Sequence, residues 1–152
     1  MTDEEFAYPT PEDILMIHEA IVTHDPRSTE GVRKPDAPES ALTYISEGYF
    51  GQVPETIHEK ATHLMRLLVS DHPFVDGNKR TALNTTETFY AMNGYYFDYS
   101  DEIKEMLKRF AGDDDIDVER VTDRCKELAR PIKDIDDEEV RAEVERLQNR
   151  VK

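Results

Sequence analysis

The sequence predicts an all-α protein. Apolar residues recur at helical spacing along most of the chain, as in the run Ile57, Ala61, Leu64 and Leu68, which steps by four, three and four. Typical helix start and stop signals flank several of these runs. One short segment, residues 47–54 (EGYFGQVP), mixes aromatic residues, glycine and valine as a small hairpin does.

The first helix is predicted to begin at Pro11. Thr10 is suited to be its N-cap, Pro11 suits the first helical position, and an acidic residue follows in the first turn. Its apolar stripe consists of Ile14, Leu15, Ile17, Ile21 and Val22. His18 lies on or beside that stripe, and we expect a hydrogen-bonded core histidine there.

Residues 25–38 contain three prolines and a glycine and predict an irregular loop, followed by a short helix over 39–46. Arg33 in this loop is either a tether or a residue near a site. Residues 47–54 are a flap or an ordinary connecting loop. An amphipathic helix follows over 55–70, with His58 and His63 expected at the solvated surface.

Residues 82–92 predict a central, buried helix, because Glu87 is the only charged side chain in the segment. Asn93-Gly94 is a typical C-terminal cap.

Beyond this, capping residues predict a helix from Ser100 to Gly112, and a further helix ends before Pro131. Asp113-Asp114-Asp115 is interpreted as a solvated hinge. Asp136 is expected to cap a last helix, whose narrow apolar stripe contains Val140, Val144, Leu147 and Val151. That stripe packs on the domain, forms a dimer seam or binds a partner, with packing as the default. We therefore expect a core domain over 1–112 and an acidic helical extension over 113–152 packed on it.

The segment with most chemistry is HPFVDGNKR, residues 72–80, directly before the central helix. A helix N-terminus presents free N–H groups and a positive dipole end, and Gly77 permits a tight turn there. Lys79 and Arg80 add two cations suited to phosphate oxygens. Asp76 is a hard oxygen ligand suited to Mg²⁺, and His72 can accept a proton near neutral pH. These residues together predict a nucleotide polyphosphate site.

This segment resembles the signature of the Fic/Doc superfamily, His-x-Phe-x-[Asp/Glu/Asn]-[Gly/Ala]-Asn-[Gly/Lys]-Arg, and every required position matches. Lys79 resembles the death-on-curing (Doc) branch, because Fic-type adenylyltransferases usually carry glycine at that position. The surrounding segments ILMIHEAI, GVRK, ESAL and EKATHLMRLLVSDHPF are also similar, so that the resemblance covers roughly residues 8–112.

The resemblance implies a helical bundle with a central buried motif helix and a small flap beside the active site. It implies His72 as general base and Asp76 as a ligand of Mg²⁺ or an orienting group. Gly77 and Asn78 would form an anion nest with the Asn78 side chain on a phosphate of ATP, and Lys79 and Arg80 would hold the other phosphates. Lys79 in place of glycine is associated with an ATP pose in which the γ-phosphoryl group faces the acceptor.

By resemblance, the expected function is that of a Doc-like toxin of a toxin–antitoxin system. It would transfer the γ-phosphate of ATP to a Ser or Thr hydroxyl of a translation elongation factor, and an antitoxin protein would neutralise it. Two alternatives remain open at this stage. One is Fic-type protein adenylylation (AMPylation), and the other is an inactive regulatory or binding module of the same fold.

Composition restricts the remaining possibilities. The formal charge is −15, from 34 acidic and 19 basic residues, which argues against nucleic-acid or anionic-membrane partners. A high-salt, halophilic setting explains such acidity, with an ordinary acidic protein as the alternative. The single cysteine, Cys125, fits a reducing cytoplasm. We expect no signal peptide and no membrane span.

Overall fold

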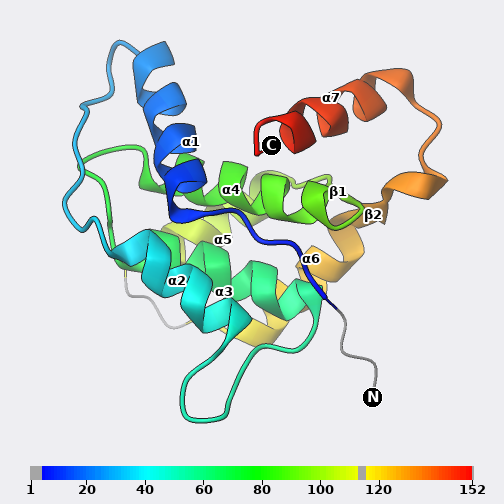
Figure 1. The fold of residues 1–152 in the computed structure, drawn as a ribbon, viewed down its shortest axis with the longest axis horizontal. Helices are drawn as coiled ribbons and strands as arrows, with labels where there is room; N and C mark the ends of the chain where they lie inside the picture. The colour runs from blue at the N-terminus through cyan, green and yellow to red at the C-terminus, as the bar shows by residue number, and fades with distance from the viewer. Residues whose placement is uncertain (1–4, 113–115, 152) are drawn as a thin grey trace.

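Helix α4 (Asn78–Met92) runs through the middle of the molecule and contacts α1, α3, α5, α7 and β1 (Figure 1). The structure is a computed structural model and describes residues 5–112 and 116–151. Phe89 and Tyr90 of α4 are fully buried, together with several of its threonines. The helix that carries the motif at its N-terminus is therefore the centre of the core, as predicted.

The other elements surround α4. They are α1 (Pro11–His24), α2 (Ala37–Ser46), α3 (Ile57–Ser70), β1 (Tyr95–Phe97), α5 (Asp101–Ala111), α6 (Val118–Leu128), β2 (Ala129–Pro131), a 3₁₀ turn (Ile132–Asp134) and α7 (Glu138–Asn149).

The prediction of an all-α fold with a small flap is confirmed. The sequence did not reveal the antiparallel pair of β1 and β2, in which Tyr96 lies opposite Arg130. Each strand has three residues, which is too short to show the alternation that marks a strand.

Helix caps explain most of the observed boundaries. Thr10 accepts a hydrogen bond from the N–H of Asp13, and the Asp13 carboxylate accepts one from the N–H of Thr10, which completes a capping box. Two expectations are corrected. The last helix is capped by Asp137 and not by Asp136, since its carboxylate accepts the N–H of Glu139. Ser100 occupies the N-cap of α5, but its buried hydroxyl has no partner among the described residues.

His58 and His63 are half-buried, so the prediction that they are solvated is wrong. Helix α3, which carries both, packs against α2, α4 and α6 and has little free surface. The Nδ1 atom of His58 lies 3.0 Å from the hydroxyl of Tyr90, and the His63 ring meets Tyr44 edge-on. Burial lowers the pKa of both imidazoles.

The flap between α2 and α3 is a short hairpin. Tyr49 and Gln52 exchange two backbone hydrogen bonds of 3.0 Å. The turn residues Phe50 and Gly51 have φ of 55° and 76°, as a two-residue hairpin loop requires. The Phe50 side chain is fully exposed at the tip.

Helix α7 packs against the C-terminal half of α4. Val144 and Leu147 of α7 form a small apolar cluster with Ala91, and the Gln148 side chain donates to the Ala91 carbonyl at 2.9 Å. The division of the chain at residue 112 stays a prediction, and the expected hinge Asp113-Asp114-Asp115 lies outside the described residues.

Glu87 lies in the interface between α4 and α7. Burial raises the pKa of its carboxyl from 4.5 to about 7, with Glu143 adding to the rise and Arg150 and Arg146 opposing it. At a pH between the ordinary pKa of 4.5 and the raised pKa of about 7, Glu87 of the folded protein holds a proton that it has released in the unfolded chain. The contribution of Glu87 to stability is therefore lost as pH rises through this window.

Replacing Glu87 by glutamine should raise the free energy of unfolding at pH 8 by on the order of 1–3 kcal/mol and change it little at pH 4.5. Denaturant unfolding of both proteins at the two pH values measures this difference. The exposed Glu145→Gln variant of α7 is the matched control. Equal destabilisation of the Glu87 variant at both pH values would contradict the buried, proton-binding carboxyl.

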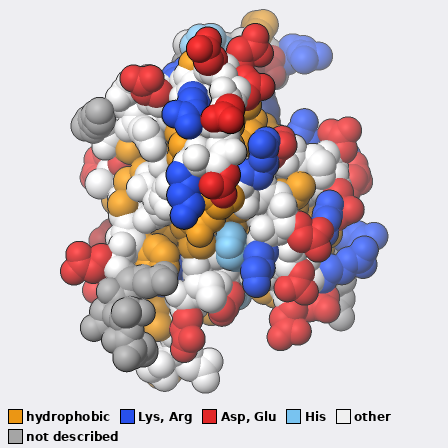
Figure 2. Space-filling model, turned by 90° about the vertical axis from the view of Figure 1, so that its right-hand side faces the viewer, with side chains coloured by type: hydrophobic (Ala, Val, Ile, Leu, Met, Phe, Trp, Pro, Cys, Tyr) orange, Lys and Arg blue, Asp and Glu red, His pale blue; other side chains and the backbone are white. Residues whose placement is uncertain are grey.

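Acidic side chains cover much of the surface. On the face shown in Figure 2 they lie both at the periphery and in the middle, interspersed with Lys and Arg side chains. Within the described ranges of the chain, every helix is too short or too polar to cross a bilayer.

The net charge of −15 predicts that salt stabilises the fold, because salt screens repulsion between carboxylates. The melting midpoint should rise by on the order of 5 °C between about 0.1 and 3 M KCl at pH 7.5. The same melts near pH 4.7, the sequence pI, are the control, because net repulsion is absent there. A flat midpoint at pH 7.5 would remove the halophilic explanation of the composition.

Candidate functional site

The motif forms the loop that follows the C-cap of α3 and the first turn of α4. Gly77 is the N-cap of α4 with φ of 79°, and no side chain caps the helix. This left-handed φ favours glycine, whereas a Cβ atom at Gly77 would make only van der Waals contact with Val22 of α1, 3.4 Å from its Cγ1. The N–H groups of the first turn therefore remain available to a ligand.

Asn78 holds the loop in shape. Its Oδ1 accepts the N–H of Phe74 at 3.0 Å, and its Nδ2 donates to the Phe74 carbonyl at 2.9 Å. Both polar atoms of the amide are thus directed at the loop backbone. The geometry favours a loop-shaping function for Asn78 over the direct phosphate contact that the family resemblance implied.

A second segment supports the loop from outside. The N–H groups of Arg33 and Lys34 donate to the carbonyl of Pro73 at 2.8 and 3.0 Å, and Val75 donates to the carbonyl of Gly31 at 3.0 Å. Arg33 therefore tethers the motif through its backbone.

His18 supports the loop from the core side. Its ring stacks on Phe74 with centroids 3.7 Å apart, and its Nε2 lies 2.8 Å from the carbonyl oxygen of Asp76. His18 is buried, which confirms the expected hydrogen-bonded core histidine. Phe74 is fully buried as well and anchors the loop.

The Asp76 carboxylate is fixed by two backbone donors. Its Oδ1 accepts the N–H of Gly77 at 2.8 Å, and its Oδ2 accepts the N–H of Thr29 at 3.2 Å. The Thr29 bond, then the Gly77 bond and the charge of Arg80 lower the pKa of this carboxyl. Asp76 is therefore an anion at neutral pH, and its remaining lone pairs can bind a cation.

Arg80 is held by the loop that follows α1. Its Nη1 donates to Oδ2 of Asp25 at 3.0 Å, and its Nη2 donates to the hydroxyl of Ser28 at 2.7 Å. Lys79 is exposed beside it and forms no ion pair within the described residues. Arg80 is therefore held by hydrogen bonds, whereas Lys79 is exposed.

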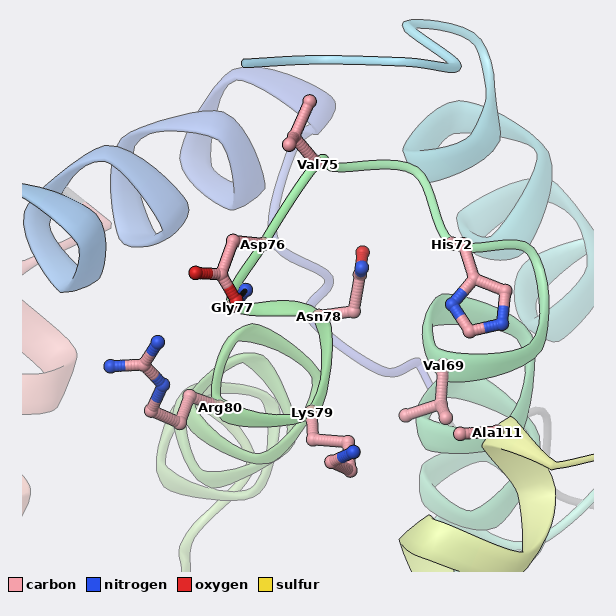
Figure 3. A pocket seen from close by; sticks show the side chains of 9 residues that line it. All are labelled: Val69, His72, Val75, Asp76, Gly77, Asn78, Lys79, Arg80 and Ala111. Carbon is pink, nitrogen blue, oxygen red and sulfur yellow. Dashed lines mark hydrogen bonds between the residues drawn. The ribbon is translucent and has the colours of Figure 1, made fainter. Parts of the chain in front are cut away.

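His72 follows the C-cap of α3. Its backbone has φ of 47°, which non-glycine residues rarely adopt, and its N–H donates to the Val69 carbonyl at 3.3 Å. The imidazole is exposed and lies across the pocket from Arg80, with Asn78 and Lys79 between them (Figure 3).

These residues line one cavity of about 200 Å³. All six predicted site residues contribute to it: His72, Asp76, Gly77, Asn78, Lys79 and Arg80. Val69, Val75 and Ala111 supply its apolar wall.

No cluster of three or more His, Cys, Asp or Glu side chains suited to a metal occurs in the described part of the chain. Asp76 would thus be the protein's share of a site completed by phosphate oxygens, as is usual for Mg²⁺.

A model of the Fic/DOC family matches residues 8–90, more than half of the 152-residue chain. The chain belongs to the Fic/DOC family. Members of the Fic/DOC family generally transfer nucleotide-derived groups to proteins. The match extends from the segment before α1 almost to the end of α4 and includes the whole pocket motif. A comparison with curated proteins gave no match.

The sequence did not predict the contacts of Asp25, Ser28 and Thr29 with the Fic/DOC motif. Residues 25–38 showed only the prolines and the glycine of an irregular loop. The sequence feature that could have indicated these contacts is the dipeptide Asp25-Pro26, which favours a turn at the end of a helix.

Proposed function

We propose that this chain is a Doc-like toxin that transfers the γ-phosphoryl group of ATP to a Ser or Thr hydroxyl of a protein. The observation that carries the proposal is the pocket at the N-terminus of α4, where the exposed cation Lys79 lies between His72 and Arg80, which is held by hydrogen bonds. Membership in the Fic/DOC family supports transfer of a nucleotide-derived group to a protein.

The pocket suits the polyphosphate of ATP. Uncapped N–H groups, the helix dipole and two cations converge on it. Its volume of about 200 Å³ is below the ~300 Å³ at which small-molecule pockets usually begin. It would therefore enclose phosphates, while the nucleoside would lie outside it.

His72 would act as the general base. A neutral imidazole nitrogen takes the proton of the acceptor hydroxyl while the hydroxyl oxygen forms a bond to the γ-phosphorus. The bond from that phosphorus to the oxygen bridging to the β-phosphate breaks, and ADP leaves with the bonding electrons. Because the His72 side chain is exposed, an acceptor on another protein can reach it.

Asp76 would hold Mg²⁺. The carboxylate is ionised, is fixed by Thr29 and Gly77, and borders the same pocket as the phosphate-binding groups. When bound, Mg²⁺ supplies neutralisation of charge on the phosphate oxygens. Lys79 and Arg80 contribute to the same neutralisation, with Arg80 on the same side of Asn78 as Asp76 (Figure 3).

Lys79 favours phosphoryl over adenylyl transfer. A long cationic side chain at this position fills space that glycine would leave for the α-phosphate, and its charge favours the γ-phosphoryl group beside His72. Fic-type adenylylation remains the alternative, because the same base and cations would serve it with the α-phosphorus in that position. An inactive binding module is disfavoured by the intact set of His72, Asp76 and both cations.

The partners follow from the resemblance to Doc proteins: a translation elongation factor as target and an antitoxin protein as inhibitor. The flap supports a protein substrate, because it exposes Tyr49, Phe50 and Val53 together. Such exposed apolar groups are typical of protein-binding surfaces. A cytoplasmic location fits this target and the free, buried Cys125.

Intact-protein mass spectrometry tests the proposal. A candidate elongation factor incubated with this protein, ATP and Mg²⁺ should gain the mass of one phosphoryl group, and the His72→Ala variant should leave it unchanged. A gain of one adenylyl group instead would establish the Fic-type alternative. No gain on any candidate target, with no binding of ATP, would favour the inactive module.

A further inference from the structure

The turn at the end of α1 contacts the motif through three interactions, two made by side chains and one by a backbone N–H. Asp25 and Ser28 bind the guanidinium of Arg80, and the N–H of Thr29 binds the carboxylate of Asp76. These contacts connect residues about fifty positions apart in the sequence. They hold two charged side chains of the motif, the guanidinium of Arg80 and the carboxylate of Asp76.

The turn itself is rigid for local reasons. The N–H of Ser28 donates to the Asp25 carbonyl at 3.0 Å, with Pro26 at the second position of the turn, where its fixed φ is favourable. The Oδ1 atom of Asp25 accepts the N–H of Arg27 at 3.0 Å. One carboxylate oxygen of Asp25 thus holds the turn, and the other is left to hold Arg80.

Ser28 completes the arrangement. As the fourth residue of the turn it places its hydroxyl 2.7 Å from Nη2 of Arg80. Two nitrogens of the guanidinium are therefore occupied, while the side chain stays 44% exposed. Because guanidinium has five N–H donors in a fixed plane, three remain for a ligand in the pocket.

We propose that Asp25 and Ser28 are positioning residues that orient Arg80 for the phosphates of ATP. This inference rests on the proposed function of the same pocket. A free arginine side chain samples many rotamers, and holding it in place before the ligand arrives reduces the entropy lost on binding. The bonds from Asp25 and Ser28 also keep Arg80 beside Asp76. The positive charge of Arg80 there offsets the negative charge of the carboxylate that would hold Mg²⁺.

The test is the affinity of MgATP for the full chain, measured directly by calorimetry, beside steady-state kinetics of transfer. Asp25→Asn should weaken MgATP binding and raise KM for ATP by about 3- to 10-fold, with kcat changed less than about twofold. Asp25→Glu should recover most of the loss. Arg27→Ala is the matched control, because Arg27 is exposed, pairs with Asp25 at 3.6 Å and does not touch the motif.

A double-mutant cycle separates positioning from a general effect on folding. If Asp25 acts through Arg80, Asp25→Asn should have no further effect on MgATP affinity in an Arg80→Ala background. Additive losses would overturn the inference. Tighter MgATP binding by Asp25→Asn would overturn it as well, since the turn would then compete with phosphate for Arg80. Failure of the wild-type chain to bind MgATP would instead reject the proposed function, so the two failures are distinguishable.

Discussion

Replacing His72 by alanine is expected to slow phosphoryl transfer by about 10²- to 10⁴-fold, while the affinity for MgATP changes less than about threefold. The imidazole is the side chain of the pocket suited to general-base catalysis, and it lies across the pocket from Arg80. The phosphate-binding groups belong to α4, so removing the His72 side chain leaves them in place. Single-turnover transfer and calorimetric binding measure the two effects separately.

His24→Ala is the matched control, because His24 is an exposed histidine at the end of α1, outside the pocket. Its rate should equal that of the wild type. Comparable transfer rates for the wild type and His72→Ala across neutral pH would exclude His72 as the base.

Replacing Lys79 by glycine should weaken phosphorylation by at least about tenfold, which corresponds to about 1.4 kcal/mol of transition-state stabilisation. Lys79 lies in the first turn of α4 and its side chain is exposed. Phosphoryl transfer depends mainly on positioning and charge neutralisation, so loss of this cation affects both. The glycine variant should also gain some adenylylation, because its pocket then resembles that of Fic-type enzymes.

Glycine itself destabilises a helix, so Lys79→Ala serves as the control that removes the side chain without adding backbone freedom. Both variants should lose phosphorylation to a similar extent. Unchanged phosphorylation in Lys79→Ala would show that Lys79 does not direct the γ-phosphoryl group.

The helices and the motif pocket followed from local patterns. The capping box at Thr10 and Asp13 and the Gly77 turn each depend on residues close in sequence. His18 was also predictable, because it lies on the apolar face of an amphipathic helix. Helical spacing predicted a helix over residues 82–92. Its burial at the centre was predictable because Glu87 is the only acidic residue of α4.

The remaining features depend on contacts between distant segments, which periodicity does not encode. Arg80 meets Asp25 only because α1 packs on α4. His58 is half-buried because Tyr90 of α4 and Tyr95 of β1, more than thirty residues later, lie against its ring. Asn78 matches the family signature at a position associated with phosphate, whereas its amide is bonded to the backbone of Phe74. The motif identified which residues form the pocket, but not which of them face a ligand.

The most direct test of the central claim uses ATP labelled separately at the α and γ positions, with a candidate elongation factor as acceptor and Mg²⁺ present. We predict that the γ label enters the acceptor on a Ser or Thr residue, that the α label does not, and that Lys79→Gly reduces γ incorporation. Incorporation of the α label alone by the wild-type protein would contradict the Doc-like assignment and establish adenylyl transfer in its place.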